Sequence, residues 1–253
     1  MNVTVLTNKN SLYGKKIIFA LIQSGLPISV VVINQPLSYY LTLIKAVAKR
    51  VGWFDAFRLL LKRVEDNKNE YNRILKEKPE LLQGYSKVCE NVVFSNGTNS
   101  MDTESALKQF ETDLLILGQP GILRKNILQI PKIGTLNGHP GVLPFYRGID
   151  CPHWALLNGE LDKIGASIHW VDQGIDTGTI IATEKFPIKG IKDVSILEES
   201  IYTLCSKMLA KIVVEFEKGN HPDGTTQLKS EGQQYYKISY KQLKSLKAIL
   251  QRL

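Results

Sequence analysis

Residues 3–33, VTVLTNKNSLYGKKIIFALIQSGLPISVVVI, contain two short apolar runs with a helical stretch between them. The runs at 3–7 and 28–33 are rich in β-branched residues and have the length of buried strands. Residues 15–25 have helical character and end at Gly25, the residue type that commonly terminates a helix. A strand, a helix and a strand at this spacing predict a βαβ unit with two parallel strands.

The same alternation continues to about residue 217. Further strands are predicted at 88–94, 113–118, 133–136, 165–171 and 179–188, and further helices at 105–111 and 193–217. The strands at 165–171 and 179–188 alternate in polarity and are joined by a glycine-containing turn, which favours an antiparallel pair. The pattern predicts an α/β fold, a Rossmann-like mostly parallel sheet flanked by helices.

Two segments lie outside this alternation. Residues 37–82 are helix-like, with a break at Gly52, and we interpret 37–85 as a helical insertion into a catalytic domain of residues 1–217. Residues 218–253 read as a small, polar C-terminal appendage.

The chain of 253 residues has a net charge of +8, which is concentrated in these two segments. Residues 45–63 contain six basic residues and one acidic residue, and residues 227–253 repeat that count. The remainder is therefore slightly acidic. A basic balance raises the possibility of an anionic partner, but the predicted α/β core is not itself basic.

Three cysteines, widely spaced and odd in number, favour a reducing compartment and offer no zinc-ligand spacing. The N-terminus lacks the layout of a signal peptide, and no run reaches the roughly 18 apolar residues of a membrane-spanning helix. We therefore expect a cytoplasmic protein without a metal site.

The loop after the first predicted strand does not carry a dinucleotide-binding fingerprint. Between residues 7 and 14 only Gly14 is a glycine, whereas that fingerprint needs three. Lys9, Asn10 and Ser11 precede a helix and could hold an anion or part of a substrate at its N-terminus. The alternative is that Asn10 or Ser11 simply caps the helix.

Residues 135–160, TLNGHPGVLPFYRGIDCPHWALLNGE, combine polar side chains with a predicted strand end. Asn137 and His139 are two residues apart, so both project from one face of an extended strand. Tyr146 and Arg147 add a ring for stacking and a fixed cation. Asp176 lies in the turn of the later strand pair. Open α/β sheets bind ligands beyond the carboxyl ends of their strands, where these residues are expected.

This segment resembles the formyltransferases that use N10-formyltetrahydrofolate. The resemblance rests on Asn137-x-His139-Pro140, on Leu143-Pro144-x-Tyr146-Arg147-Gly148, on Trp154-Ala155-Leu156-x-Asn158-Gly159-Glu160, on Gly165-x-x-Ile168-His169 and on Asp172-x-Gly174-Ile175-Asp176-Thr177-Gly178. It is specific between about residues 113 and 182 and weaker over residues 1–35. It implies a catalytic trio of Asn137, His139 and Asp176.

The chain departs from the family pattern in two places. Gly141 stands where the family often has serine, and the interval from His139 to Asp176 is one residue longer than usual, with the extra residue near 149–151. Both departures concern the loop beside the trio and not the trio itself.

The implied reaction is attack of a neutral primary amine on the formyl carbon. Asn137 and a protonated His139 would donate to the developing oxyanion. Asp176 would keep His139 charged, because an opposite charge raises the pKa of an imidazole, and would help to remove the amine proton.

The resemblance also implies contacts for both substrates. The folate would bind the loop of Gln119, Pro120, Gly121, Ile122 and Leu123, and the turn that begins at Asp172. The second substrate would contact Lys9, Asn10, Ser11, Tyr146 and Arg147, with Tyr146 stacked on a base. We interpret His153, His169 and His221 as structural, and Cys151 lacks the basic neighbour that would make it a nucleophile.

Among acceptors, the resemblance favours a nucleotide-linked amino sugar of surface polysaccharide biosynthesis, such as lipopolysaccharide. Relatives of this type have a comparable length and a C-terminal appendage that can pair two subunits, so we expect a homodimer. Methionyl-tRNA normally needs a larger C-terminal domain, and nucleic acid is not the expected partner. Glycinamide ribonucleotide normally needs a glycine-rich phosphate loop, and hydroxy-ornithine remains a further alternative.

Three competing interpretations stay open. The basic, aromatic segment 37–64 could lie on an anionic membrane surface instead of forming a flap or a dimer contact. A hydrolase that releases formate could use the same trio. A non-catalytic binding module would need a broken trio position, and none is broken.

Overall fold

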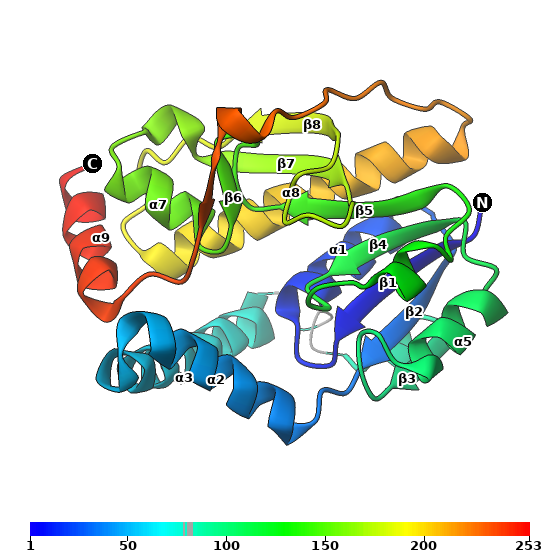
Figure 1. The fold of residues 1–253 in the computed structure, drawn as a ribbon, viewed down its shortest axis with the longest axis horizontal. Helices are drawn as coiled ribbons and strands as arrows, with labels where there is room; N and C mark the ends of the chain where they lie inside the picture. The colour runs from blue at the N-terminus through cyan, green and yellow to red at the C-terminus, as the bar shows by residue number, and fades with distance from the viewer. Residues whose placement is uncertain (78, 80–82) are drawn as a thin grey trace.

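The computed structural model describes residues 1–77, 79 and 83–253, and its centre is a seven-stranded sheet (Figure 1). The strand order is β3-β2-β1-β4-β5-β7-β8. The strands are β1 (Val3–Asn8), β2 (Ile28–Ile33), β3 (Asn91–Ser95), β4 (Leu114–Gly118), β5 (Gly134–His139), β7 (Gly165–Trp170) and β8 (Ile180–Lys185). The first five are parallel, whereas β7 is antiparallel to both β5 and β8. The predicted α/β fold with a mostly parallel sheet is confirmed.

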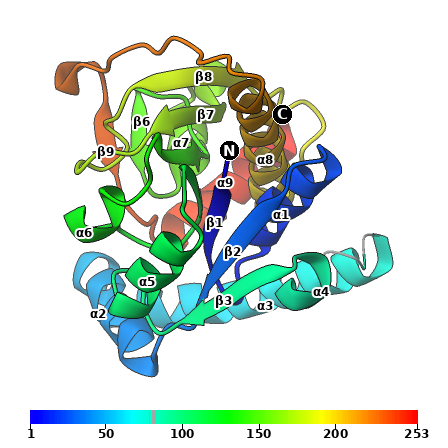
Figure 2. The ribbon, with the colours of Figure 1, turned by 90° about the vertical axis from the view of Figure 1, so that its right-hand side faces the viewer.

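Helices cover both faces of the sheet (Figure 2). Helix α1 (Leu12–Gln23) and α8 (Val194–Glu217) pack on one face, while α5 (Met101–Gln109) and α6 (Lys125–Leu128) lie on the other. Successive strand residues point to opposite faces of the sheet. Val5 packs on the side of α1 and α8, and Leu6 packs on the side of α5 and α6. Strands β1, β2 and β4 are buried on both faces, which explains why they appear in the sequence as continuous apolar runs.

Short elements complete the chain. They are α4 (Tyr85–Val88), β6 (Tyr146–Gly148), α7 (Cys151–Leu157), β9 (Gln233–Tyr235), α9 (Tyr240–Arg252) and the 3₁₀ turns at Leu161–Lys163 and Lys229–Glu231.

Helix ends follow local side-chain chemistry. The Ser11 hydroxyl accepts the Gly14 N–H at the start of α1, and Gly25 after its end has φ +74°. Asp193 accepts from the Ser195 N–H at the start of α8. These contacts satisfy backbone groups that a helix end leaves without partners. Of the two capping residues considered for α1, Ser11 is the one that caps the helix.

The C-terminal segment is folded into the domain. Strand β9 pairs in parallel with β6, and α9 places Leu246 and Leu250, both fully buried, in the same hydrophobic cluster as the α1 and α8 side of the sheet. The segment 218–253, predicted as a small polar appendage, therefore contributes to the core of the domain. The charges that dominate its composition lie on exposed positions such as Lys241 and Lys244, which flank a narrow apolar stripe.

The insertion forms two helices, α2 (Leu37–Val51) and α3 (Trp53–Glu77), separated at Gly52 as predicted. The predicted helical character at residues 78 and 80–82 lies outside the described residues. Both helices bury few side chains, and α3 contacts α9, where the Arg58 guanidinium lies 5.3 Å from the centre of the Tyr240 ring. Among the helices of the described residues, none is long and apolar enough to cross a membrane.

Candidate active site

Strand β5 ends in the two polar residues that the sequence analysis singled out. The register of the β5–β7 pair places Asn137 opposite His169 and His139 opposite Ser167. The Asn137 Nδ2 atom lies 3.1 Å from His169 Nε2. The strand thus delivers both polar side chains to the carboxyl edge of the sheet, where ligands bind in such folds.

Asp176 joins this group from the turn between β7 and β8. Its Oδ2 atom lies 3.4 Å from His139 Nδ1 and accepts the Gly148 N–H at 2.8 Å, while its Oδ1 atom lies 3.4 Å from His169 Nε2. The residue has φ +52°, a left-handed conformation that aspartate tolerates better than most residues. The predicted trio therefore converges, with His169 as the link between Asn137 and Asp176.

His139 is 2% exposed, and both ring nitrogens face oxygen atoms. Its Nε2 atom lies 2.8 Å from the Tyr146 carbonyl oxygen, and its Nδ1 atom faces Asp176. Burial lowers the pKa of His139 below its ordinary value, and the Asp176 carboxylate opposes this shift without overcoming it. The expected raised pKa is therefore wrong, because desolvation of the ring outweighs the neighbouring charge.

Asp176 remains ionised in this environment. Burial alone would raise the pKa of the carboxyl group, but His139, His169 and the Gly148 N–H together hold it below its ordinary value. The site thus contains a buried carboxylate between two imidazole rings.

His169 is the site residue that the sequence interpretation placed outside the chemistry. Its ring is buried, and its Nδ1 atom lies 2.7 Å from the Trp170 carbonyl oxygen. Its Nε2 atom faces both the Asn137 amide and the Asp176 carboxylate. The alternating pattern of 165–171 predicts a strand that contains His169. Only the register in which this strand pairs with β5 shows that His169 faces Asn137.

The β1–α1 loop lies at the same edge of the sheet. Lys9 and Asn10 are exposed, whereas the Ser11 hydroxyl is used in capping and also lies 3.2 Å from Gln119 Oε1. The loop is held from below by Tyr85, whose hydroxyl donates to the Asn8 and Lys9 carbonyls.

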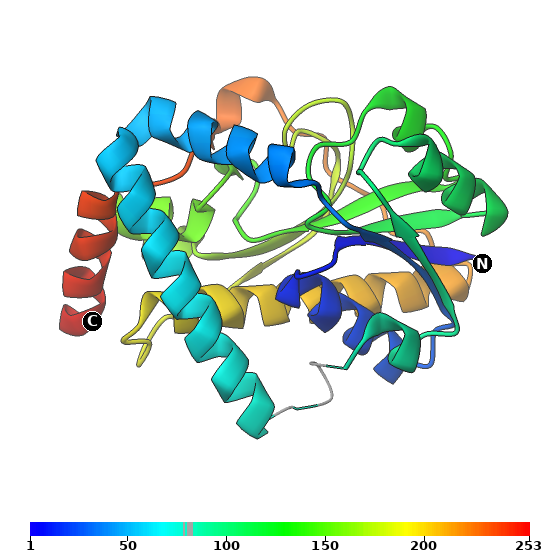
Figure 3. The same cartoon turned by 90° about the horizontal axis from the view of Figure 1, so that it is seen from below.

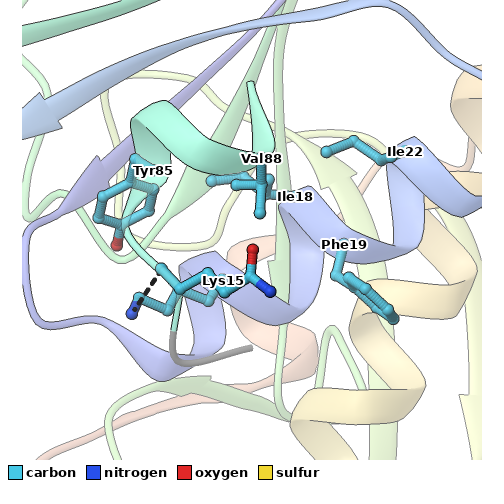
Figure 4. A pocket seen from close by; sticks show the side chains of 7 residues that line it. Lys15, Ile18, Phe19, Ile22, Tyr85 and Val88 are labelled. Carbon is cyan, nitrogen blue, oxygen red and sulfur yellow. Dashed lines mark hydrogen bonds between the residues drawn. The ribbon is translucent and has the colours of Figure 1, made fainter. Parts of the chain in front are cut away.

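Tyr85 belongs to a shallow pocket between α1 and α4 that lies beside this loop (Figure 4). Lys15 lines the same pocket and donates to the Gln83 carbonyl at 3.3 Å. Burial raises the pKa of Tyr85 to about 12, so its hydroxyl stays a donor at every physiological pH. The hydrogen bonds of the Tyr85 hydroxyl fix the end of the insertion to the loop that carries Lys9 and Asn10.

The predicted folate loop follows β4. Gln119 and Gly121 both have positive φ, and the Gln119 side chain donates to the Tyr202 hydroxyl at 3.3 Å. The Pro120 carbonyl accepts from Thr98, and the Ile122 carbonyl accepts from Asn99 at 2.9 Å. Leu123 is buried in the core, whereas Ile122 is 75% exposed. The loop is thus anchored from behind and presents an apolar side chain outward.

Asp172 opens the β7–β8 turn and is exposed. Its carboxylate accepts the Gly174 N–H at 2.9 Å and the Thr177 hydroxyl at 2.8 Å. These bonds hold the turn that carries Asp176.

Tyr146 and Arg147 occupy different surroundings from those we expected. The Tyr146 ring is 1% exposed and stacks on Tyr235 with ring centres 4.8 Å apart, while its hydroxyl donates to Glu160. Arg147 is also buried and donates to the Leu228 carbonyl at 3.0 Å. The structure corrects both substrate-contact predictions, because β9 and the segment before it cover these side chains. The polar composition of the C-terminal segment does not indicate that it packs over Tyr146 and Arg147.

The segment that precedes β9 also contacts the catalytic turn. The Gln227 side chain donates to the Asp176 carbonyl at 3.1 Å and to the Gly178 carbonyl, and it accepts from Arg147 Nε at 3.3 Å. Gln227 therefore ties the turn of Asp176 to the strand β6. The sequence carried no local signal for this contact, since it joins residues about fifty positions apart.

Gly141 packs directly against His139. A Cβ atom at this position would lie 2.7 Å from His139 Nε2 and 2.8 Å from the Cys151 Cβ atom. Gly141 and Cys151, which belong to the two departures from the family pattern, thus lie side by side. Burial raises the pKa of the Cys151 thiol, which agrees with its interpretation as a non-nucleophile.

Three side chains near the site have the composition of a metal cluster: Asp150, His153 and Glu198. The His153 ring is buried and neither nitrogen has a hydrogen-bond partner among the described residues. However, the Asp150 carboxylate already accepts from Lys237 Nζ at 2.9 Å and from the Ile238 N–H at 3.0 Å. An ammonium group on the same oxygen opposes a metal cation, so we assign no metal to this cluster.

Solved structures share this fold. The chain matches the crystal structure of glycinamide ribonucleotide transformylase 1 from Symbiobacterium toebii with a TM-score of 0.56 and 16% identity, covering 90% of this chain and 94% of that chain. It matches a sugar N-formyltransferase from Shewanella sp FDAARGOS_354 with a TM-score of 0.54 and 13% identity, covering 93% of this chain and 76% of that chain. Identities this low establish the fold alone.

Sequence relatives share more residues over a shorter stretch. A methionyl-tRNA formyltransferase from Syntrophus aciditrophicus is 34% identical over 117 residues, which are 46% of this chain and 37% of that protein. The chain spans less than half the length of the curated relatives that it matches. The family model described as formyl transferase matches residues 1–213, which is most of the chain and includes Asn137, His139 and Asp176. The chain therefore belongs to the formyl transferase family.

Proposed function

We propose that this chain transfers the formyl group of N10-formyltetrahydrofolate to the primary amine of a nucleotide-linked amino sugar. The observation that carries the proposal is the convergence of Asn137, His139 and Asp176 at the carboxyl end of β5 in a member of the formyl transferase family. An amide donor, a neutral imidazole and a fixed carboxylate are the groups that acyl transfer to an amine requires.

Asn137 stabilises the oxygen of the formyl group. Its amide has two N–H donors, and one of them faces His169 Nε2. The second is left for the negative charge that develops on the formyl oxygen as the amine attacks. His169 orients this amide through that contact.

His139 and Asp176 handle the proton of the attacking amine. The new C–N bond forms while the electrons of the C=O bond move to oxygen, and the amine nitrogen must then lose a proton. Developing negative charge raises the pKa of a neighbouring imidazole, so a neutral His139 becomes a proton acceptor at that moment. Asp176 then stabilises the imidazolium. The proton finally passes to N10 as the bond from N10 to the formyl carbon breaks, which restores the neutral ring.

In this proposal the folate binds between the 119–123 loop and the turn of Asp172 to Asp176. This chain presents exposed apolar side chains on both segments, Ile122 and Ile175, which fit the flat faces of a pterin. Gly121 has φ +97°, so the loop can turn its backbone toward a ligand at close range.

The choice of an amino sugar draws on the sugar N-formyltransferase that shares the fold over 93% of this chain. The exposed Lys9 and Asn10 beside the site supply a cation and an amide for a phosphate or a sugar.

A second candidate acceptor is initiator methionyl-tRNA. Its support is the 34% identity to a methionyl-tRNA formyltransferase across the segment that matches.

The test is incubation of the purified protein with N10-formyltetrahydrofolate and a panel of nucleotide-linked amino sugars. Mass spectrometry should detect the gain of one formyl group on a panel member, and Asp176→Asn should abolish it. Product from methionyl-tRNA alone would select the second candidate. Loss of formyl-folate without any amine would instead indicate a hydrolase.

A further inference from the structure

We propose that Tyr13 is a positioning residue for formyl transfer, whose hydroxyl fixes the part of β5 that carries Asn137 and His139. The inference rests on the proposed function, because it concerns the same two catalytic side chains. Tyr13 is the second residue of α1 and is 4% exposed. Its hydroxyl donates to the Gly138 carbonyl at 2.8 Å.

This hydrogen bond lies between the two catalytic residues. Gly138 separates Asn137 from His139, and its carbonyl group lies in the same peptide plane as the His139 N–H. The register of β4 against β5 runs from Gly134 to Asn137 and stops one residue before Gly138. A donor that holds the Gly138 carbonyl therefore fixes the peptide group from which His139 projects.

Glycine at position 138 makes room for the Tyr13 hydroxyl. A Cβ atom on Gly138 would overlap this hydroxyl, and it would lie 3.0 Å from Leu209 Cδ1 and 3.2 Å from the Cys205 Cβ atom. The space that a side chain would take at this position is thus filled by Tyr13 and by two residues of α8. Gly138 and Tyr13 form a matched pair, because a larger residue at 138 would displace the hydroxyl from the carbonyl that it binds.

Tyr13 approaches β5 from behind the catalytic side chains. Successive residues of a strand point to opposite faces, so position 138 faces away from the side that carries Asn137 and His139. Figure 3 shows α1 (blue) beside α8 (gold) on one side of the sheet, and Tyr13 belongs to the hydrophobic cluster on that side. It therefore acts on the reaction through the position of β5.

A second aromatic ring keeps Tyr13 in place. Tyr202 of α8 stacks on it, with ring centres 4.8 Å apart and ring planes inclined by 30°. A ring that is packed this closely has little freedom to turn, so the hydroxyl stays directed at Gly138. Burial raises the pKa of Tyr13 well above its ordinary value, so the hydroxyl remains a donor at physiological pH.

The first experiment compares Tyr13→Phe with Thr4→Val in the formyl transfer assay. Tyr13→Phe keeps the ring and removes the bond to Gly138. We expect kcat to fall about tenfold while the KM for N10-formyltetrahydrofolate changes by less than about twofold, because the catalytic groups are displaced and the folate loop is not.

Thr4→Val is the matched control for the loss of a buried hydroxyl. Thr4 is fully buried near the opposite end of β1, and its hydroxyl lies 2.8 Å from the Thr112 hydroxyl. This variant should lose stability and keep the wild-type kcat. An unchanged kcat in Tyr13→Phe, or an equal loss in both variants, would overturn the proposal.

The second experiment tests the matched pair without any substrate. Gly138→Ala should lower the urea midpoint of unfolding in the wild-type chain, because the added methyl meets the Tyr13 hydroxyl. In the Tyr13→Phe background that hydroxyl is gone, so the same substitution should lower the midpoint by less. Equal reductions in the two backgrounds would show that the hydroxyl does not occupy this space, and the proposal would fail.

The third experiment follows the His139 ring itself. Long-range proton–nitrogen correlation spectra report the ring nitrogens of the four histidines, and His139→Gln identifies the signals of His139. Tyr13→Phe should shift these signals, whereas Thr4→Val should leave them in place. Unchanged His139 signals in Tyr13→Phe would refute the positioning role.

The spectra also separate this inference from the proposed function. They need neither a formyl donor nor an acceptor, so they test the role of Tyr13 whichever amine the enzyme uses. A wild-type chain that formylates no member of the acceptor panel would count against the proposed function, while the shift of the His139 signals would still decide the role of Tyr13.

Discussion

At the scale of single residues, Asp176 is the side chain on which the site depends most. It contacts His139, His169 and the Gly148 N–H, and no other carboxylate among the described residues contacts two imidazoles. Removing this carboxylate would therefore change the electrostatic environment of both imidazole rings.

Replacing Asp176 with asparagine should reduce kcat/KM by about 10²–10³ or more, at least as much as Asn137→Ala. An amide keeps the shape but cannot stabilise an imidazolium on His139. The formyl transfer assay measures the loss, with the exposed Asp223→Asn as the control. An Asp176→Asn enzyme with near-normal activity would refute the assigned role.

Gly141→Ala tests the close packing behind His139. The added methyl would lie 2.7 Å from His139 Nε2 and 2.8 Å from the Cys151 Cβ atom, and both neighbours are buried. We expect a loss of about 1–3 kcal/mol in the free energy of unfolding and a lower kcat. Urea denaturation measures the first effect. Gly84→Ala is the matched control, because a Cβ atom there meets nothing within 4 Å. Equal stability of the two variants would contradict the packing argument.

The buried His139 should make stability depend on pH. Its pKa is lowered in the folded protein, whereas an unfolded histidine titrates near about 6.5. The unfolded state therefore binds more protons below that pH, and the free energy of unfolding should fall as the pH drops through about 6.5. Urea denaturation between pH 5.5 and 7.5 measures the slope.

His139→Gln should flatten this pH dependence, whereas the exposed His221→Gln should leave it unchanged. A steeper slope in the His139→Gln variant would mean that the folded ring prefers its charged form.

Residue identity predicted part of the site from the sequence. Asn137, His139 and Asp176 stand out because their polar side chains interrupt apolar strands or occupy a glycine-flanked turn. The predicted substrate contacts of Tyr146 and Arg147 are wrong, because both side chains are buried by contacts with segments that are distant in the sequence. The lowered pKa of His139 was equally hidden, because desolvation depends on the packing around the ring.

At the scale of elements, the buried strands were predictable and the short edge elements were not. Strands β1, β2 and β4 are buried on both faces, so their apolar runs mark them in the sequence. Strands β6 and β9 have three residues each, too few to show a period. Helix α9 was missed because its lysines dominate the composition of the segment.

Gln227→Ala tests the contact between the C-terminal segment and the catalytic turn. The substitution removes the bonds to the Asp176 and Gly178 carbonyls, so the turn loses its link to Arg147. We expect kcat to fall by about tenfold, because a misplaced catalytic group is costly, with a smaller change in stability. Gln233→Ala, an exposed position on β9, is the control. Normal activity of Gln227→Ala would show that the turn holds Asp176 without this bond.

At the scale of the whole molecule, α9 and the sheet share one hydrophobic core. Leu250→Ala should lower the global free energy of unfolding by about 2–5 kcal/mol, although it lies far in sequence from every strand of the main sheet. The variant should unfold in a single cooperative transition. Its midpoint should be lowered equally when it is monitored by tryptophan fluorescence and by circular dichroism. The partly exposed Leu253→Ala should have little effect. Separate transitions for the two probes would mean that α9 unfolds independently.

The contact of Gln227 with the turn of Asp176 has a consequence for biosynthesis. A nascent chain that has emerged from the ribosome only as far as α8 already contains Asn137, His139 and Asp176, yet it lacks the residues that cover Tyr146 and brace the catalytic turn. Formyl transfer should therefore begin only after residues 227–250 have been translated and have docked.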